Sequence, residues 1–434
     1  MAIESLSFSM RRRRIADLAT DLLRRNGWGV ADQVLISATN FITMILIARE
    51  LSPAAFGAFT LGYSALLFAN SVQSSLITQP LSVLSATNSG QDSAGFVTTT
   101  ATSQICLAIG LAIIAWGAAA IAYAAGGGVA DLLLALGPAI LAWQSQEFVR
   151  RLLYVQERLG AAFLNDVISY GGQAIVVVVL WWREALTGPA AVYALAATSA
   201  LAVVFGMRQL RGSFGRRLDF GVVIENWNFG KWLGGAELLR WLSSGHMYQY
   251  LAALILGTTA TGTLRAAEIV FGPTRVLTFY LNTVLPTRFS RTFATDGHAG
   301  LRGQLKLTYA VIVPLVGSYC LLIALLAGPL LRLLYGDNYV GGSSVLALYA
   351  LSAFLGYQMQ IVSAALRAKR LTRPIFVTYV YTSVITLSSG WLLILLLGVK
   401  GGIVGMIMTS LVATVRFWRV FNQDLLATPG RANV

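Results

Sequence analysis

The sequence has few of the residues on which enzyme sites, disulfides and soluble surfaces depend. Of its 434 residues, two are cysteine and two are histidine, and 12% are charged, against about 25% in a typical soluble protein. Cys106 and Cys320 both fall within long apolar stretches, so we expect two separate packing residues and no disulfide. The sequence contains no metal-ligand cluster, no Walker sequence and no nucleophile–base motif. We therefore predict that the chain is not an enzyme and carries no cofactor or metal.

Long apolar stretches take up most of the chain. Hydrophobic residues make up 56% of the sequence, and the mean hydropathy is +0.69. Stretches of about 20 residues, the length that crosses ~30 Å of hydrocarbon, recur from one end to the other. We predict spans over 27–48, 54–78, 97–124, 129–152, 161–182, 188–207, 229–256, 260–286, 307–327, 341–366, 374–398 and 400–421. The predicted fold class is an all-α integral membrane protein with about 12 transmembrane helices.

Basic residues lie mainly on alternate connections between these spans. The net charge is +14, and 25 of the 32 Lys and Arg residues lie on one side, that is, before the first span, after the last, on every second connection or in the ends of the spans that border these segments. The opposite connections hold only Arg49, Arg183, Arg332 and Lys400. The positive-inside rule then predicts that the basic side and both termini are cytoplasmic. This placement explains the positive charge without a nucleic-acid partner.

Six spans precede the longest basic connection and six follow it. We therefore predict two six-helix lobes related by a pseudo-two-fold axis along the membrane normal, with alternating access to a cavity between them. The predicted divisions are a cytoplasmic basic amphipathic segment (1–26), an N-terminal lobe (27–207), a cytoplasmic linker (208–228), a C-terminal lobe (229–421) and a cytoplasmic tail (422–434). The first segment is expected either to lie on anionic membrane lipids or only to fix the topology.

Charged residues inside the spans are the main candidates for a binding site, because a charge in lipid is costly and usually faces a cavity or a partner. Span 7 contains Glu237 and Arg240, and span 8 contains Arg265, Glu268 and Arg275. In a continuous helix the three charged residues of span 8 share one face. Glu237, Arg240 and Arg275 then reach a similar depth near the middle of the membrane.

We predict that Arg240, Arg275 and Arg265 bind an anionic phosphate-bearing group, because the planar guanidinium makes paired, charge-assisted bonds to phosphate. Glu237 and Glu268 are the predicted charge partners, which hold the arginines in the empty site or take up a coupling cation. The alternative is that these residues form internal ion pairs that only lock spans 7 and 8 together.

Three acidic residues lie near the cytoplasmic ends of spans in the first half. Asp32, about one turn into span 1, is predicted either to bind a proton or Na⁺ for coupling or to interact with the helix dipole. Glu147 is expected to form an ion pair with Arg150 and Arg151. Asp166 lies near the start of span 5, and the sequence assigns it no role.

Three short runs resemble a known family. ARELSPAAFG at 48–57 joins spans 1 and 2, LYGDNY at 334–339 leads into span 10, and AALRAKR at 364–370 ends span 10. Together with the hydropathy of the whole chain, these runs are similar to Wzx-type polysaccharide and O-antigen flippases of the multidrug/oligosaccharidyl-lipid/polysaccharide (MOP) exporter superfamily.

The resemblance implies two lobes around a cationic cavity in the bacterial inner membrane. It implies that an undecaprenyl-diphosphate-linked oligosaccharide is flipped to the periplasmic leaflet for exopolysaccharide, capsule or O-antigen biosynthesis, with coupling to H⁺ or Na⁺. Membrane lipids, a polysaccharide polymerase and a chain-length regulator are the partners this function implies.

Three other classes are weighed against this prediction. A cation-coupled multidrug exporter of the same superfamily predicts a cavity rich in carboxylates. The excess of arginine argues against this class, whereas Asp32 is compatible with it. A major-facilitator transporter predicts an acidic–basic motif between spans 2 and 3, where this chain has only Asp92. A scaffold for polysaccharide assembly predicts that the intramembrane arginines have no role in transport.

Overall fold

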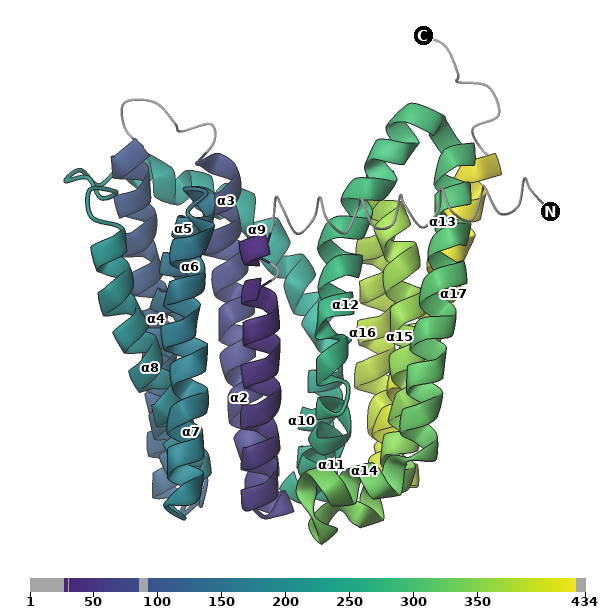
Figure 1. The fold of residues 1–434 in the computed structure, drawn as a ribbon, viewed down its shortest axis with the longest axis horizontal. Helices are drawn as coiled ribbons and strands as arrows, with labels where there is room; N and C mark the ends of the chain where they lie inside the picture. The colour runs from purple at the N-terminus through teal and green to yellow at the C-terminus, as the bar shows by residue number, and fades with distance from the viewer. Residues whose placement is uncertain (1–26, 30, 86–92, 427–434) are drawn as a thin grey trace.

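The computed structural model describes residues 27–29, 31–85 and 93–426, so the predicted segment 1–26 and the tail beyond Leu426 lie outside these ranges. Every regular element within these ranges is helical. Figure 1 shows the helices arranged as two lobes that stand side by side with their long helices running in the same general direction. The predicted all-α, two-lobed membrane fold is confirmed.

The N-terminal lobe is built from the helices before residue 210. It comprises a first helix (Gly27–Glu50), α2 (Pro53–Gln73), η1 (Ser74–Thr78), α3 (Gln79–Leu84), α4 (Ser93–Ala124), α5 (Ala130–Val155), α6 (Leu159–Asp166), η2 (Val167–Gly171), α7 (Gly172–Trp182) and α8 (Gly188–Gln209). α2 has Pro53 as its first residue and α8 has Pro189 as its second, and the missing N–H costs no helical hydrogen bond in the first turn. Ser52 and Thr187 cap these two helices by accepting a backbone N–H bond.

The C-terminal lobe begins at Phe220, so the irregular connection covers 210–219 and both ends of the predicted linker are helical. It comprises α9 (Phe220–Leu242), α10 (Gly245–Leu256), α11 (Thr258–Ile269), η3 (Gly272–Thr274), α12 (Arg275–Phe279), η4 (Tyr280–Val284), α13 (Leu285–Leu325), α14 (Ala327–Tyr335), η5 (Asp337–Gly342), α15 (Ser343–Ala368), α16 (Thr372–Leu397) and α17 (Val399–Leu426).

Spans 7 and 8 differ from the prediction because neither is a continuous helix. The first breaks at Ser243 and Ser244, between α9 and α10. The second breaks after α11, where Pro273 lies in a short 3₁₀ turn and has no N–H to continue the preceding α-helix. Ten helices among the described residues are long and apolar enough to span a membrane, so the predicted number of helices is not confirmed.

The two lobes meet where α2 crosses α11. A Cβ atom on Gly57 would lie 1.7 Å from the carbonyl oxygen of Thr258, and one on Gly262 would lie 2.2 Å from that of Pro53. Only glycine allows two helix backbones to approach this closely. This contact lies at the lower end of the molecule in Figure 1, which we call the far end.

The opposite end carries the basic connections 156–158, 210–219 and 369–371, and we call it the basic end. There α9 contacts both lobes. The Asn226 amide donates to Oγ1 of Thr100 in α4 at 3.1 Å, and Oγ of Ser383 in α16 donates to the carbonyl oxygen of Leu239 at 2.8 Å. α9 therefore belongs to the second half by sequence but links the two lobes in space.

The crossing of α2 and α11 gives a first prediction. Gly57→Ala should destabilise the contact by about 1–3 kcal/mol, because the added methyl group overlaps the backbone of α11. The distance between spin labels at Tyr123 and Leu333, which are exposed near the far end of each lobe, should therefore increase. The measurement is double electron–electron resonance on protein whose two native cysteines are replaced by serine.

Gly110→Ala is the matched control, since an added Cβ there meets no atom within 4 Å. An unchanged distance distribution in Gly57→Ala would show that the glycine contact does not hold the far end closed.

Candidate functional site

Three adjoining cavities follow the inner face of the C-terminal lobe. The inner, connecting and outer cavities have volumes of about 350, 250 and 810 Å³, and Met359 and Gln360 of α15 line all three. The outer cavity reaches the basic end, where Ser75 and Gln79 of the N-terminal lobe also line it. These shared walls make one polar route from the basic end into the C-terminal lobe.

Arg240 and Glu237 lie on α9 in the outer cavity and form the ion pair that their spacing predicts. Nε of Arg240 donates to Oε2 of Glu237 at 2.8 Å, and its Nη2 contacts Oε1. The Arg240 side chain nevertheless remains 52% exposed. An anion in the cavity can therefore reach this guanidinium without breaking the pair.

Arg367 and Arg373 also line the outer cavity, although the sequence pattern assigns them only to membrane topology. Nη2 of Arg367 donates to Oδ1 of Asn282 at 3.0 Å. Among the described residues, neither arginine lies within 4.0 Å of a carboxylate. The described lining therefore holds three arginines against one glutamate, a net charge of +2. Arg367 ends α15 and Arg373 begins α16, and this place beside the connection 369–371 was the available signal, but only the fold shows that these helix ends face the cavity.

Arg265 is buried at the contact between the lobes, with 2% of its side chain exposed. Nη1 lies 2.8 Å from Oε2 of Glu268, and the guanidinium carbon lies 5.9 Å from the ring centroid of Tyr63 in α2. Gln249 also donates to Glu268 at 2.7 Å. Arg265 lines the inner cavity, but its contacts join α11 to α2. Here the predicted alternative of an internal ion pair fits better than an open anion site.

Arg275 begins α12 and is exposed in the inner cavity. It lies within 4.0 Å of no carboxylate among the described residues. The helix breaks before Arg275, so span 8 is not the continuous helix that the prediction assumed, yet Arg265, Glu268 and Arg275 all line the inner cavity. Arg275 and Arg240 line different cavities, which the connecting cavity joins.

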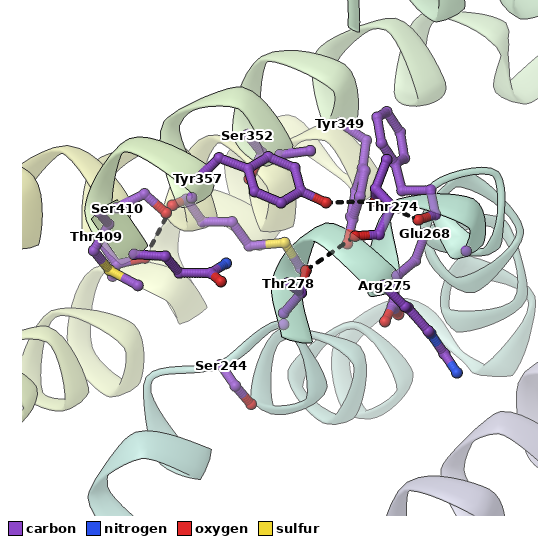
Figure 2. A pocket seen from close by; sticks show the side chains of 18 of the residues that line it. Ser244, Glu268, Thr274, Arg275, Thr278, Tyr349, Ser352, Tyr357, Thr409 and Ser410 are labelled. Carbon is purple, nitrogen blue, oxygen red and sulfur yellow. Dashed lines mark hydrogen bonds between the residues drawn. The ribbon is translucent and has the colours of Figure 1, made fainter. Parts of the chain in front are cut away.

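Hydroxyl groups surround the rest of the inner cavity (Figure 2). The Tyr357 hydroxyl donates to Oγ1 of Thr274, and both residues lie close to Glu268 and Tyr349 in the figure. The other hydroxyl-bearing lining residues are Ser243, Ser244, Thr278, Ser352, Thr409 and Ser410. Such a lining can exchange hydrogen bonds with a sugar, because each hydroxyl both donates and accepts.

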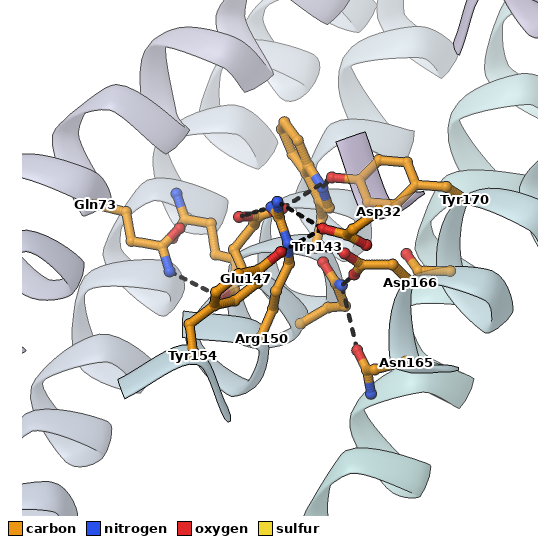
Figure 3. Close-up of polar contacts among 12 residues, drawn as sticks. Asp32, Gln73, Trp143, Glu147, Arg150, Tyr154, Asn165, Asp166 and Tyr170 are labelled. Carbon is orange, nitrogen blue, oxygen red and sulfur yellow. Dashed lines mark hydrogen bonds and ion pairs between the residues drawn. The ribbon is translucent and has the colours of Figure 1, made fainter. Parts of the chain in front are cut away.

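The N-terminal lobe contains a separate buried cluster of charges, in which three carboxylates surround Arg150 (Figure 3). Arg150 lies 3.4 Å from Asp32, 3.0 Å from Glu147 and 2.8 Å from Asp166. The predicted pair of Glu147 with Arg150 is therefore present. The side chains of Asp32 and Asp166 are 2% and 0% exposed, and Oδ2 of Asp32 accepts a bond from Tyr154 at 2.6 Å.

The cluster holds more acid than base. Three carboxylates face one guanidinium, so a fully ionised set has a net charge of −2. Oδ1 of Asp32 is buried and has no hydrogen-bond partner among the described residues. A proton or a monovalent cation bound here relieves the excess charge. The sequence could not predict this meeting, because the three carboxylates come from three helices whose packing brings them together.

Comparisons with known proteins identify the family. Residues 46–344 match the model of a family described as polysaccharide biosynthesis protein. The chain belongs to that family, and the resemblance to Wzx-type flippases of the MOP superfamily is confirmed. No curated protein matches the sequence.

The fold is shared with solved transporters. An inward-facing multidrug resistance MATE family transporter of the MOP superfamily has a TM-score of 0.74 at 13% identity, covering 91% of this chain and 96% of its own. The lipid II flippase MurJ in an inward closed conformation has a TM-score of 0.71 at 14% identity, covering 91% and 88%. An outward-facing MATE family transporter has a TM-score of 0.63 at 14% identity, covering 94% and 95%. These likenesses show that the chain shares the fold of these transporters.

The carboxylate cluster gives a second prediction. Arg150→Gln should destabilise the protein by about 3–5 kcal/mol, because it leaves buried carboxylates without their counter-charge. Adding Asp166→Asn should restore part of this loss by removing one of those charges. The measurement is reversible unfolding of the purified protein in mixed micelles.

Arg332→Gln is the control, because its ion pair with Asp337 is exposed and should contribute only about 0–1 kcal/mol. A similarly small loss of stability for Arg150→Gln would contradict the assignment of Arg150 as the counter-charge of the cluster.

Proposed function

We propose that the protein flips an undecaprenyl-diphosphate-linked oligosaccharide across the bacterial inner membrane, with both termini in the cytoplasm. The positive lining of the outer cavity is the observation that carries this proposal. Three arginines at the basic end suit a diphosphate, since each guanidinium can make two parallel charge-assisted bonds to its oxygens. The volume of the outer cavity, about 810 Å³, lies within the ~300–1,000 Å³ of small-ligand pockets.

The proposed path has two steps within the cavities. The diphosphate first contacts Arg240, Arg367 and Arg373 in the outer cavity and then reaches Arg275 through the connecting cavity. The saccharide occupies the hydroxyl-lined inner cavity while the polyprenyl tail stays in lipid. The product would supply exopolysaccharide, capsule or O-antigen assembly, in which a polymerase and a chain-length regulator are the expected partners.

The buried carboxylate cluster supports coupling to an H⁺ or Na⁺ gradient. The cluster has excess negative charge, and it lies in the lobe opposite the arginine-lined cavities. Asp32 is the proposed coupling residue because one of its buried oxygens has no hydrogen-bond partner among the described residues. Glu237 and Glu268 act instead as ion-pair partners of Arg240 and Arg265.

A multidrug exporter is the second candidate, since MATE transporters share the fold and the N-terminal cluster favours cations. The described lining of the outer cavity argues against this function, because its net positive charge repels organic cations.

The third prediction concerns the substrate. Arg240→Gln/Arg275→Gln should lower the flipping rate of a fluorescent undecaprenyl-diphosphate saccharide at least about 10-fold, because each lost charge-assisted bond is worth about 1.5–3 kcal/mol. The measurement is flipping in proteoliposomes at subsaturating substrate.

Arg216→Gln/Arg217→Gln, which removes two exposed charges of the 210–219 connection, is the matched control. Equal flipping rates for the two variants would show that Arg240 and Arg275 do not bind the substrate. Failure of the folded wild type to flip any saccharide, together with efflux of organic cations, would favour the multidrug exporter.

The fourth prediction concerns coupling. An imposed H⁺ or Na⁺ gradient should accelerate flipping by the wild type but not by Asp32→Asn, which should keep its gradient-free rate. Vesicles with a pH gradient at constant Na⁺, and with a Na⁺ gradient at constant pH, distinguish the two ions. Asp337→Asn, which changes an exposed carboxylate at the far end, should respond like the wild type. If the gradient accelerated flipping by Asp32→Asn as much as flipping by the wild type, Asp32 would not be the coupling residue.

A further inference from the structure

A second basic site lies on the C-terminal lobe apart from the substrate cavities. It is a groove of about 270 Å³ between α13 and α17 near the basic end. Its lining residues are Arg302, Leu305, Lys306, Tyr309, Trp418, Phe421 and Asn422, none of which lines the inner, connecting or outer cavity. This groove is therefore separate from the substrate cavities.

The spacing of the lining residues on α13 brings the two cations onto one face. At 100° per residue, Arg302, Lys306 and Tyr309 lie within about 60° of each other. They follow the sharp turn at Gly297, whose φ of 61° lies in the left-handed region that glycine tolerates. The turn folds α13 back at the basic end, so these residues begin the descent of the helix into the membrane (Figure 1).

Aromatic rings close the groove from the side of α17. The rings of Tyr309 and Trp418 have centroids 5.7 Å apart, and Trp418 and Phe421 meet edge to face at 5.7 Å. The Tyr309 hydroxyl also donates to the carbonyl oxygen of Gln358 in α15 at 3.3 Å. Tyrosine and tryptophan prefer the level of the lipid headgroups, where one part of the ring system is wet and the other apolar.

Among the side chains that the structure describes, no carboxylate pairs with the two cations of the groove. Arg302 and Lys306 are exposed, and neither lies within 4.0 Å of such a carboxylate. Lys369 lies behind the groove with its Nζ 5.2 Å from the ring centroid of Phe421.

An apolar strip continues from the groove toward the middle of the membrane. Leu411 and Val415 of α17 are 49% and 42% exposed. They lie within about 60° of the face that carries Trp418 and Asn422. A ligand with an anionic head in the groove can thus lay an apolar chain along α17.

We propose that this groove binds the phosphate headgroup of an anionic phospholipid from the membrane leaflet at the basic end. The phosphate contacts Arg302 and Lys306, Asn422 donates to the headgroup, and one acyl chain lies on Leu411 and Val415. The apolar strip and the aromatic rings select a lipid over a soluble phosphate. The site does not depend on the flipped substrate, because it shares no lining residue with the substrate cavities.

The experiment uses the full chain in vesicles of phosphatidylcholine with a small fraction of photoactivatable phosphatidylglycerol. Cross-links mapped by mass spectrometry should include peptides around 302–309 and 411–422. Arg302→Gln/Lys306→Gln should reduce these cross-links about 20-fold, because each basic residue near an anionic lipid contributes about fivefold in affinity. Arg302→Lys/Lys306→Arg should retain them, since both charges remain.

Arg216→Gln/Arg217→Gln, which removes an exposed pair of charges away from the groove, should leave these cross-links unchanged. Equal melting temperatures in pure phosphatidylcholine check that the variants fold. The proposal is overturned if photoactivatable phosphatidylcholine labels the groove as strongly as phosphatidylglycerol does. It is also overturned if phosphatidylglycerol labels the Arg302→Gln/Lys306→Gln variant as strongly as the wild type. Full competition by soluble glycerol phosphate would instead identify a free-phosphate site.

Discussion

The crossing of α2 and α11 is the contact on which the rest of the arrangement depends. Because Gly57 and Gly262 have no side chains, the lobes touch backbone to backbone at the far end. Closing that end leaves the polar cavities to reach the surface at the basic end, where loops rich in arginine surround them.

The two lobes differ in the sign of the charge that they group together. The N-terminal lobe groups three carboxylates around Arg150, whereas the outer cavity of the C-terminal lobe groups three arginines with one glutamate. Such charges are costly in lipid, so each set is stabilised by pairing or by water in a cavity. In the proposed function, this separation places the coupling cation and the anionic lipid in different lobes, so that they do not neutralise each other directly.

Features set by local sequence were predictable, and features set by helix packing were not. Hydropathy and basic connections predicted the membrane fold, and the three-residue spacing predicted the pairs Arg240–Glu237 and Arg265–Glu268. The change of helix between Arg265 and Arg275 could not be predicted from the 3.6-residue period alone, because it arises at the break around Pro273. The roles of Arg367 and Arg373 and the carboxylate cluster depend on contacts between helices distant in sequence.

α9 constrains how the molecule can move. Asn226 holds its first half to the N-terminal lobe, and the carbonyl of Leu239 holds its last turn to α16. Widening the basic end therefore stretches or bends the helix between these two anchors, a stretch that contains the pair Gly234 and Gly235. Adjacent glycines make a helix easy to bend. α9 thus acts as an elastic tether between the lobes, and its stiffness limits how far the basic end can open.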